Sequence, residues 1–207
     1  MEQLLDSARR STGTYRPDVE APAFGAVVLD VDSGICRIDG IEWLAARRGE
    51  SVLRTVAALG AGARAGLLAP RTAYAEQLAA IRPSRGDLDA LAGAYLVALA
   101  PDCADVLARL RRAGIRIVIV SRGPRHAMYR LAYRLGIEPA DVHAVDIRFD
   151  ALGAYAGFDP GSLVTTAAET RLVAEGSESD RPALLVGNGA GQRPVASFTE
   201  LAAVALG

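Results

Sequence analysis

The chain has 207 residues, a formal net charge of −1 and a pI near 6.1, which indicates one core domain and argues against a general nucleic-acid binder. No apolar run approaches the roughly 18 residues of a membrane span. Residues 1–20 lack the apolar stretch of a secretory signal. We therefore expect a cytoplasmic protein with neither a nucleic-acid nor a membrane partner.

Three short apolar segments, at residues 24–29, 115–120 and 183–186, predict buried parallel strands, because each leads into a polar or glycine-rich loop. Residues 142–149 and 154–158 alternate around a turn and predict a hairpin. Helical patterns are predicted over residues 41–48, 71–80, 102–113, 124–135, 165–175 and 198–206, with a further helix that starts at Ser84. The order of these segments indicates an α/β fold with a parallel sheet flanked by helices.

The chain is predicted to consist of three parts. Residues 1–20 read as an N-terminal arm of mixed charge. Residues 45–93 carry helical patterns without strand patterns, which predicts a small helical cap. Residues 21–44 and 94–207 are expected to form the Rossmann-like core into which this cap is inserted.

Polar side chains follow each of the three predicted strands. Asp30 and Asp32 follow the first, Ser121 the second and Asn188 the third. Ligands of open parallel sheets bind at the carboxyl ends of the strands, so these side chains should meet there. Two carboxylates two residues apart on an extended loop can face one pocket, as nucleophile and as acid/base. Taken alone, Asp-x-Asp also fits a solvated turn, and Ser121 also fits a helix N-cap.

Five segments in this order resemble the phosphoserine phosphatases of the haloacid dehalogenase superfamily. They are DVDSGICRIDGIEWLA, LAAIRPSR, SRG, GAYAGFD and LLVGNGAG, and the resemblance runs from Val27 to Ala190. It implies a core with a C1-type cap after the first motif. It also implies that Asp30 attacks phosphorus, that Asp32 acts as acid and base, and that Ser121 binds a phosphoryl oxygen.

Other positions depart from the family pattern. The family's third motif supplies a lysine, but the chain contains none, and Thr166 or its neighbour Thr165 falls at that position. Only an arginine such as Arg122, Arg125 or Arg171 could take its place, with a different geometry.

The fourth motif is also changed, because Asn188 and Gln192 stand where the family has aspartates. The resemblance implies a magnesium ion on Asp30, Asp32 and Asn188, but neutral amides weaken this site, since magnesium favours carboxylate oxygens. The sequence therefore predicts no definite cofactor, and at most a weakened magnesium site.

The resemblance further implies a substrate-binding set made of Asp39, Gln77, Arg122, Gly123 and Thr166. Asp39 replaces a family glutamate, and Gln77 replaces an arginine that grips a substrate carboxylate. A neutral amide cannot form a bidentate ion pair, so phosphoserine should be a poor ligand. Arg122 replaces a family glycine and brings a cation to the pocket.

Three functions remain open from the sequence. The first is a repurposed enzyme that uses Asp30 and Asp32 as nucleophile or acid/base on a small polar substrate. The second is a slow magnesium-dependent phosphomonoesterase, and the third is a non-catalytic binding or scaffold protein. A small-molecule substrate is the expected partner, and a homodimer paired through the cap or the sheet edge is compatible with the sequence.

Overall fold

The computed structural model describes residues 22–32, 34–174, 181–187, 193 and 197–206. Its centre is a four-stranded sheet in the order β3-β2-β1-β6, in which every neighbouring pair is parallel. The strands are β1 (Ala26–Asp30), β2 (Arg116–Pro124), β3 (Val142–Val145) and β6 (Ala183–Val186). The mixed α/β architecture expected from the sequence is thus confirmed.

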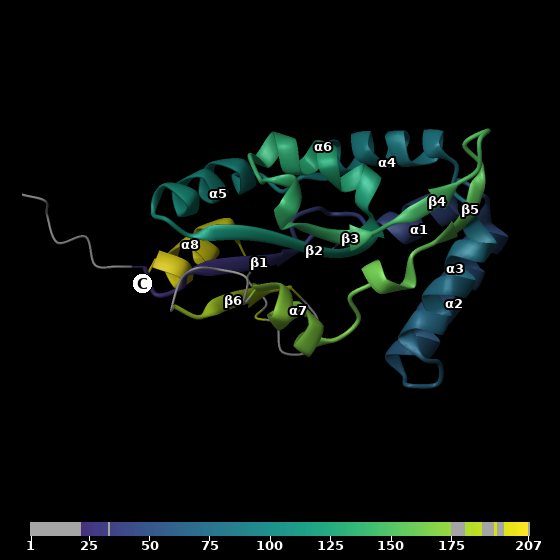
Figure 1. Cartoon of the computed structure of the whole chain (residues 1–207), viewed down its shortest axis with the longest axis horizontal. Coiled ribbons are helices and arrows are strands. Elements are labelled where there is room, and N and C mark those ends of the chain that lie inside the picture. The colour runs from purple at the N-terminus through teal and green to yellow at the C-terminus, as the bar shows by residue number, and fades with distance from the viewer. Residues whose placement is uncertain (1–21, 33, 175–180, 188–192, 194–196, 207) are drawn as a thin grey trace, which may run out of the picture.

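Helices cover both faces of this sheet, as Figure 1 shows. On one face, α5 (Cys103–Arg112), α6 (Arg125–Leu135) and α8 (Phe198–Leu206) share a large apolar cluster with Val27 and Leu29. On the other face, Val28 packs in a smaller cluster that includes Val173 of α7 (Ala167–Ala174). Successive residues of β1 are therefore buried on opposite faces, which explains why the strand is apolar throughout.

The chain between β1 and α5 forms four helices, which are α1 (Gly40–Ala46), α2 (Glu50–Arg64), α3 (Pro70–Ile81) and α4 (Arg85–Ala98). Helices α1, α2 and α3 contact one another and lie beyond the carboxyl ends of the strands, whereas α4 lies along α6 (Figure 1). Ser84 caps α4 in a reciprocal capping box with Asp87, as its position before a helical pattern predicted. The division into a cap of residues 45–93 and a core stays a prediction.

The segment 142–149 differs from its prediction as one arm of a hairpin. Val142–Val145 forms β3, which pairs in parallel with β2, and only β4 (Ile147–Phe149) pairs with β5 (Tyr155–Phe158) as a hairpin. The change occurs at Asp146, whose carboxylate accepts a hydrogen bond from Arg125 Nε at 2.7 Å. The alternation shifts phase just before this residue, since the adjacent side chains of Ala144 and Val145 are both buried, and this shift marks the point where the chain changes partner.

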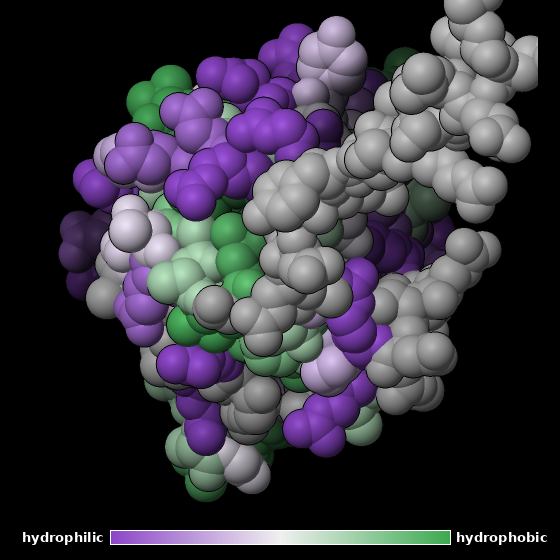
Figure 2. All heavy atoms as spheres, turned by 90° about the vertical axis from the view of Figure 1, so that its left-hand side faces the viewer, coloured by the Kyte–Doolittle hydropathy of each residue, from purple (hydrophilic) through white to green (hydrophobic). Residues whose placement is uncertain are grey.

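The described residues also form two short 3-10 helices, η1 (Pro139–Asp141) and η2 (Pro160–Ser162). No helix among the described residues has the length and apolar character needed to cross a bilayer. The end of the molecule where the parallel strands begin is mostly hydrophilic around a small hydrophobic area (Figure 2). Asp30, Asp32 and Ser121 lie at the opposite end, where β1 and β2 finish, and Asn188 lies outside the described residues.

Candidate active site

Asp30 is the last residue of β1, and the chain turns sharply after it, so that Asp32 also lies at the carboxyl end of the sheet. Ile35 N donates to Asp30 O at 3.3 Å, and Cys36 N donates to Val31 O at 3.0 Å. A Cβ atom on Gly34 would lie 2.0 Å from Asp30 O. Only glycine therefore fits this turn without moving the backbone that carries Asp30.

The Asp32 carboxylate accepts hydrogen bonds from three separate segments. Its Oδ1 accepts from Gly40 N at 2.8 Å and from the Tyr95 hydroxyl at 2.8 Å. Its Oδ2 accepts from Ser121 Oγ at 3.1 Å. The carboxylate pair and Ser121 thus come together, as the strand-end argument predicted, and the first residue of α1 and helix α4 complete the arrangement.

Tyr95 is the member of this group that the sequence did not indicate. It lies on α4 and is fully buried. An added Cβ would lie 1.9 Å from Tyr95 Oη at Gly40 and 2.8 Å from it at Gly123. These two glycines leave space for the Tyr95 hydroxyl to reach Asp32. The contact that the structure shows for Gly123 is thus the close packing of its backbone against Tyr95.

The last residues of β2, beyond the predicted end of this strand at residue 120, carry the other predicted residues. Ser121 Oγ accepts from Gly123 N at 2.9 Å while its own hydroxyl donates to Asp32. Tyr74 of α3 donates to the carbonyl oxygen of Arg122 at 2.5 Å, which holds the backbone of this segment against α3. The Arg122 side chain is exposed and faces the cleft described below.

Burial dominates the charge state of the two aspartates. Desolvation, followed by the charge of Asp32, raises the pKa of Asp30 to about 7, although Arg122 opposes this shift. Desolvation, followed by the charge of Asp39, also raises the pKa of Asp32, against the hydrogen bonds from Gly40, Tyr95 and Ser121. The pair is therefore a set of carboxylates whose ionisation is opposed by the protein.

A cleft lies between Asp32 and helices α2 and α3. It encloses about 390 Å³, including the space that opens to solvent. It is lined by Asp32, Asp39, Ile41, Glu42, Val56, Gly60, Arg64, Tyr74, Gln77 and Arg122. Next to Asp32, carboxylate, guanidinium and amide groups form the walls of this open cleft, and such groups suit a polar ligand.

Known proteins share this arrangement of strands and loops. The model of the haloacid dehalogenase-like hydrolase family matches residues 27–191. The chain belongs to this family. Phosphoserine phosphatases of Rattus norvegicus and Homo sapiens are 34% and 33% identical over 134 residues, which cover 65% of this chain and 59% of those proteins. The chain therefore matches less than two thirds of the length of these relatives.

Solved structures agree on the fold of this haloacid dehalogenase-like chain. A phosphoserine phosphohydrolase-like protein from Francisella tularensis superposes with a TM-score of 0.70 at 18% identity, covering 80% of this chain and 78% of that one. A probable phosphoserine phosphatase from Vibrio cholerae gives 0.61 at 20% identity, covering 80% and 51%. At such identities the likeness concerns the fold alone.

Two residues predicted to bind substrate line the cleft but have structural partners. Asp39 is the N-cap of α1, and its Oδ1 accepts from Ile41 N at 2.9 Å and from Glu42 N at 3.0 Å. Gln77 Nε2 donates to the carbonyl oxygen of Val56 at 2.9 Å, which links α3 to α2. Substrate contact by either residue stays a prediction.

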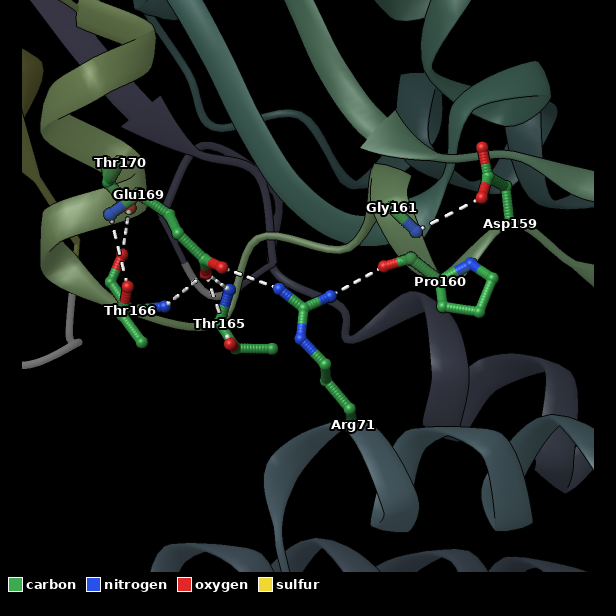
Figure 3. A network of polar contacts seen from close by, with 8 residues as sticks. All are labelled: Arg71, Asp159, Pro160, Gly161, Thr165, Thr166, Glu169 and Thr170. Atoms are coloured by element: carbon green, nitrogen blue, oxygen red, sulfur yellow. Dashed lines mark hydrogen bonds and ion pairs between the residues drawn. The ribbon is translucent and has the colours of Figure 1, made fainter.

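The position of the missing family lysine is occupied by a capping network (Figure 3). Thr166 Oγ1 accepts from Glu169 N at 3.1 Å, and Thr166 N donates to Glu169 Oε2 at 3.0 Å. Thr165 donates to the same oxygen, and Arg71 of α3 donates to Glu169 Oε1 at 2.5 Å and to Pro160 O at 2.6 Å. The substrate-binding role predicted for Thr166 stays a prediction, and its cap groups are already engaged.

The three arginines proposed as substitutes for this lysine lie in different places. Arg125 is held by Asp146 and by the carbonyl oxygen of Val142. Arg171 is exposed on α7. Arg122 lines the cleft and is the arginine whose charge lowers the pKa of Asp30. Of the three, Arg122 alone combines both properties within the described part of the chain.

The donor set fits a magnesium ion poorly. Asp32 already uses both carboxylate oxygens to accept hydrogen bonds, and Arg122 brings positive charge next to Asp30. Asn188 and Gln192 lie outside the described residues, and both are neutral amides. A hard dication needs more anionic oxygen than this arrangement offers.

Proposed function

We propose that this chain is an enzyme that uses Asp30 and Asp32 as nucleophile or acid/base on a small polar substrate in the cleft. The observation that carries the proposal is the position of the Asp32 carboxylate, which three donors hold at the wall of a cleft just after Asp30. A solvated turn would not place an aspartate among buried donors on three segments. The intact pair therefore supports chemistry in this cleft.

The surroundings favour proton transfer over the family's metal-assisted phosphoryl transfer. A pKa of about 7 lets Asp30 take up and release a proton near neutral pH. Loss of one preorganised charge stabiliser costs about 3 kcal/mol of transition-state binding, and this chain has no lysine to provide it. The chain is thus proposed to be a poor phosphoserine phosphatase.

A screen of small phosphomonoesters and carboxylic esters tests this proposal, with each compound run in EDTA and in millimolar magnesium. We expect turnover that persists in EDTA and falls at least about 1000-fold in Asp30→Asn. Asp105→Asn, which changes an exposed aspartate of α5, should leave turnover intact. Full turnover in Asp30→Asn would overturn the proposal.

A slow magnesium-dependent phosphomonoesterase is a second candidate. It is favoured by Arg122, whose charge acts on Asp30 and could partly replace the missing lysine, and by the similarity to phosphoserine phosphatases. It predicts turnover of p-nitrophenyl phosphate that rises with magnesium and disappears in Asp30→Asn. Turnover that does not change with magnesium excludes it. Ligand binding without turnover of any compound would instead support a non-catalytic protein.

A further inference from the structure

Tyr95 occupies a singular position relative to the carboxylate pair. Its ring is fully buried, and its hydroxyl donates to Asp32 Oδ1 at 2.8 Å from a helix 63 residues further along the chain. A buried tyrosine needs a partner for its hydroxyl, but the protein interior offers many neutral acceptors for that purpose. Here the partner is a carboxylate of the candidate active site.

Two glycines from different segments adapt the site to this hydroxyl. Gly40, at the start of α1, has no room for a Cβ because Tyr95 Oη and Cζ would lie 1.9 and 2.9 Å from it. Gly123 would place a Cβ 2.8 Å from Tyr95 Oη, 3.2 Å from Ser121 Oγ and 2.4 Å from Met128 Cε. The backbone therefore approaches Tyr95 on both sides of Asp32.

The three hydrogen bonds together define how the carboxylate is turned. Tyr95 and Gly40 both donate to Oδ1, and Ser121 donates to Oδ2 from the other side. Without Tyr95, one donor remains on each oxygen, and the plane of the carboxylate is less constrained. Oδ2, which accepts the longest of the three bonds, is the oxygen with the most capacity to exchange a proton with a ligand.

We propose that Tyr95 is a positioning residue for Asp32, an inference that rests on the proposed function. Its hydroxyl fixes the orientation of the carboxylate so that Asp32 Oδ2 stays directed for proton transfer. A displacement of about 1 Å at a reacting group can cost on the order of 100-fold in rate. The packing of the ring stabilises the fold, and the hydroxyl carries the positioning role.

The test compares Tyr95→Phe with wild type on a substrate identified by the screen above. Phenylalanine keeps the ring and removes the hydroxyl. We expect kcat to fall about 10-fold to 100-fold with little change in KM. Leu88→Ala removes a fully buried side chain from the same helix and should lower the Tm while leaving kcat of the folded protein unchanged. A kcat for Tyr95→Phe equal to that of wild type would overturn the inference.

Gly40→Ala provides an independent arm, because its Cβ must displace the Tyr95 hydroxyl. The rate losses of Gly40→Ala and Tyr95→Phe should be less than additive in the double variant, since both remove the hydrogen bond from the Tyr95 hydroxyl, although Gly40→Ala also disturbs the bond from Gly40 N to Asp32. Fully additive losses would contradict the inference. If Asp30→Asn retains turnover, the proposed function fails; if Asp30→Asn is inactive and Tyr95→Phe is fully active, only the positioning role fails.

A crystal structure of Tyr95→Phe gives a readout that needs no substrate. We expect the Asp32 carboxylate to turn relative to wild type while Gly40 and Ser121 stay in place. A carboxylate that keeps its orientation without the hydroxyl would overturn the positioning role.

Discussion

Asp32 and Glu169 are both carboxylates that accept several hydrogen bonds, and they lie in opposite electrostatic surroundings. Asp32 accepts from Gly40, Tyr95 and Ser121, in a buried setting that raises its pKa. Glu169 is about one third exposed, and hydrogen bonds led by the one from Thr165 N, together with Arg71, lower its pKa to about 2. Hydrogen bonds alone therefore do not decide the charge state of a carboxylate.

The comparison concerns two regions, the end of β1 and the start of α7, which in the family would both contribute to one active site. At the end of β1, buried carboxylates lie close together with Arg122 as the nearby cation. At the start of α7, a glutamate ties a helix cap to α3 through Arg71 (Figure 3). At the end of β1, burial raises the pKa of both aspartates, and such shifted pKa values are typical of functional sites. At the start of α7, the charge of Glu169 is satisfied by backbone donors and by Arg71, as in a structural helix cap.

The largest expected effect is that of Asp30→Asn on stability. The folded-state pKa of about 7 lies above the ordinary 3.8, so the folded protein binds more protons than the unfolded one and loses stability as pH rises between these values. The variant should match wild type below pH 4 and exceed its unfolding free energy above pH 7 by at most about 4 kcal/mol. Denaturant unfolding across this range measures it, and a constant difference would contradict the account.

Gly123→Ala should have the next largest effect, because its Cβ would crowd Met128, Tyr95 and Ser121. We expect a loss of about 1–3 kcal/mol in the free energy of unfolding. Gly93→Ala on α4 is the control, since a Cβ there meets no atom within 4 Å, and it should stabilise the helix by about 0.5–1 kcal/mol. Equal effects of the two variants would count against the close packing around Asp32.

Thr166→Val should destabilise the protein by about 1 kcal/mol, because it removes the hydroxyl that accepts from Glu169 N. Thr166→Ser keeps this acceptor and should stay close to wild type. Thermal unfolding of both variants measures the effect. If Thr166→Val is as stable as wild type but binds the substrate weakly, Thr166 has the substrate-binding role predicted from the family alignment.

The smallest effect is expected at the ion pair of Arg71 and Glu169, whose side chains are 44% and 34% exposed. Arg71→Gln should lower stability by less than about 1 kcal/mol, and by less still in high salt. Arg54→Gln, which breaks an exposed pair with Glu50 within α2, is the matched control. A loss of several kcal/mol for Arg71→Gln would show that the contact between Arg71 and Glu169 is more than a surface ion pair.

Most of the fold could be predicted because its signals are local. The apolar segments of β1, β2 and β6 lie between glycines and polar loops, and helix ends such as Gly136, with φ of 65°, follow backbone preferences. The run from Val142 to Phe149 predicts a single hairpin arm because it is rich in apolar residues, although its alternation shifts phase at Ala144 and Val145. Whether a strand pairs with β2 or with β5 depends on distant contacts that a local pattern does not contain.

The residues of the candidate site that lie at strand ends could be predicted from the sequence, but those on helices could not. Asp30 and Asp32 lie at the end of β1 and Ser121 lies near the end of its parallel neighbour β2, so the topology alone brings them together. Tyr95 lies in the middle of a helix, and its partner is far away in sequence, so no spacing marks it. The role of Arg71 was hidden for the same reason, since its contacts with Pro160 and Glu169 join segments about 90 residues apart.

The proposed function requires that Asp30 and Asp32 exchange protons near neutral pH without a metal ion. An NMR titration that follows the carboxyl carbon of Asp30, assigned with Asp30→Asn, tests it most directly. The account predicts a midpoint near pH 7 that does not move in millimolar magnesium. A midpoint near the ordinary value of 3.8, or one that magnesium shifts strongly downward, would contradict it.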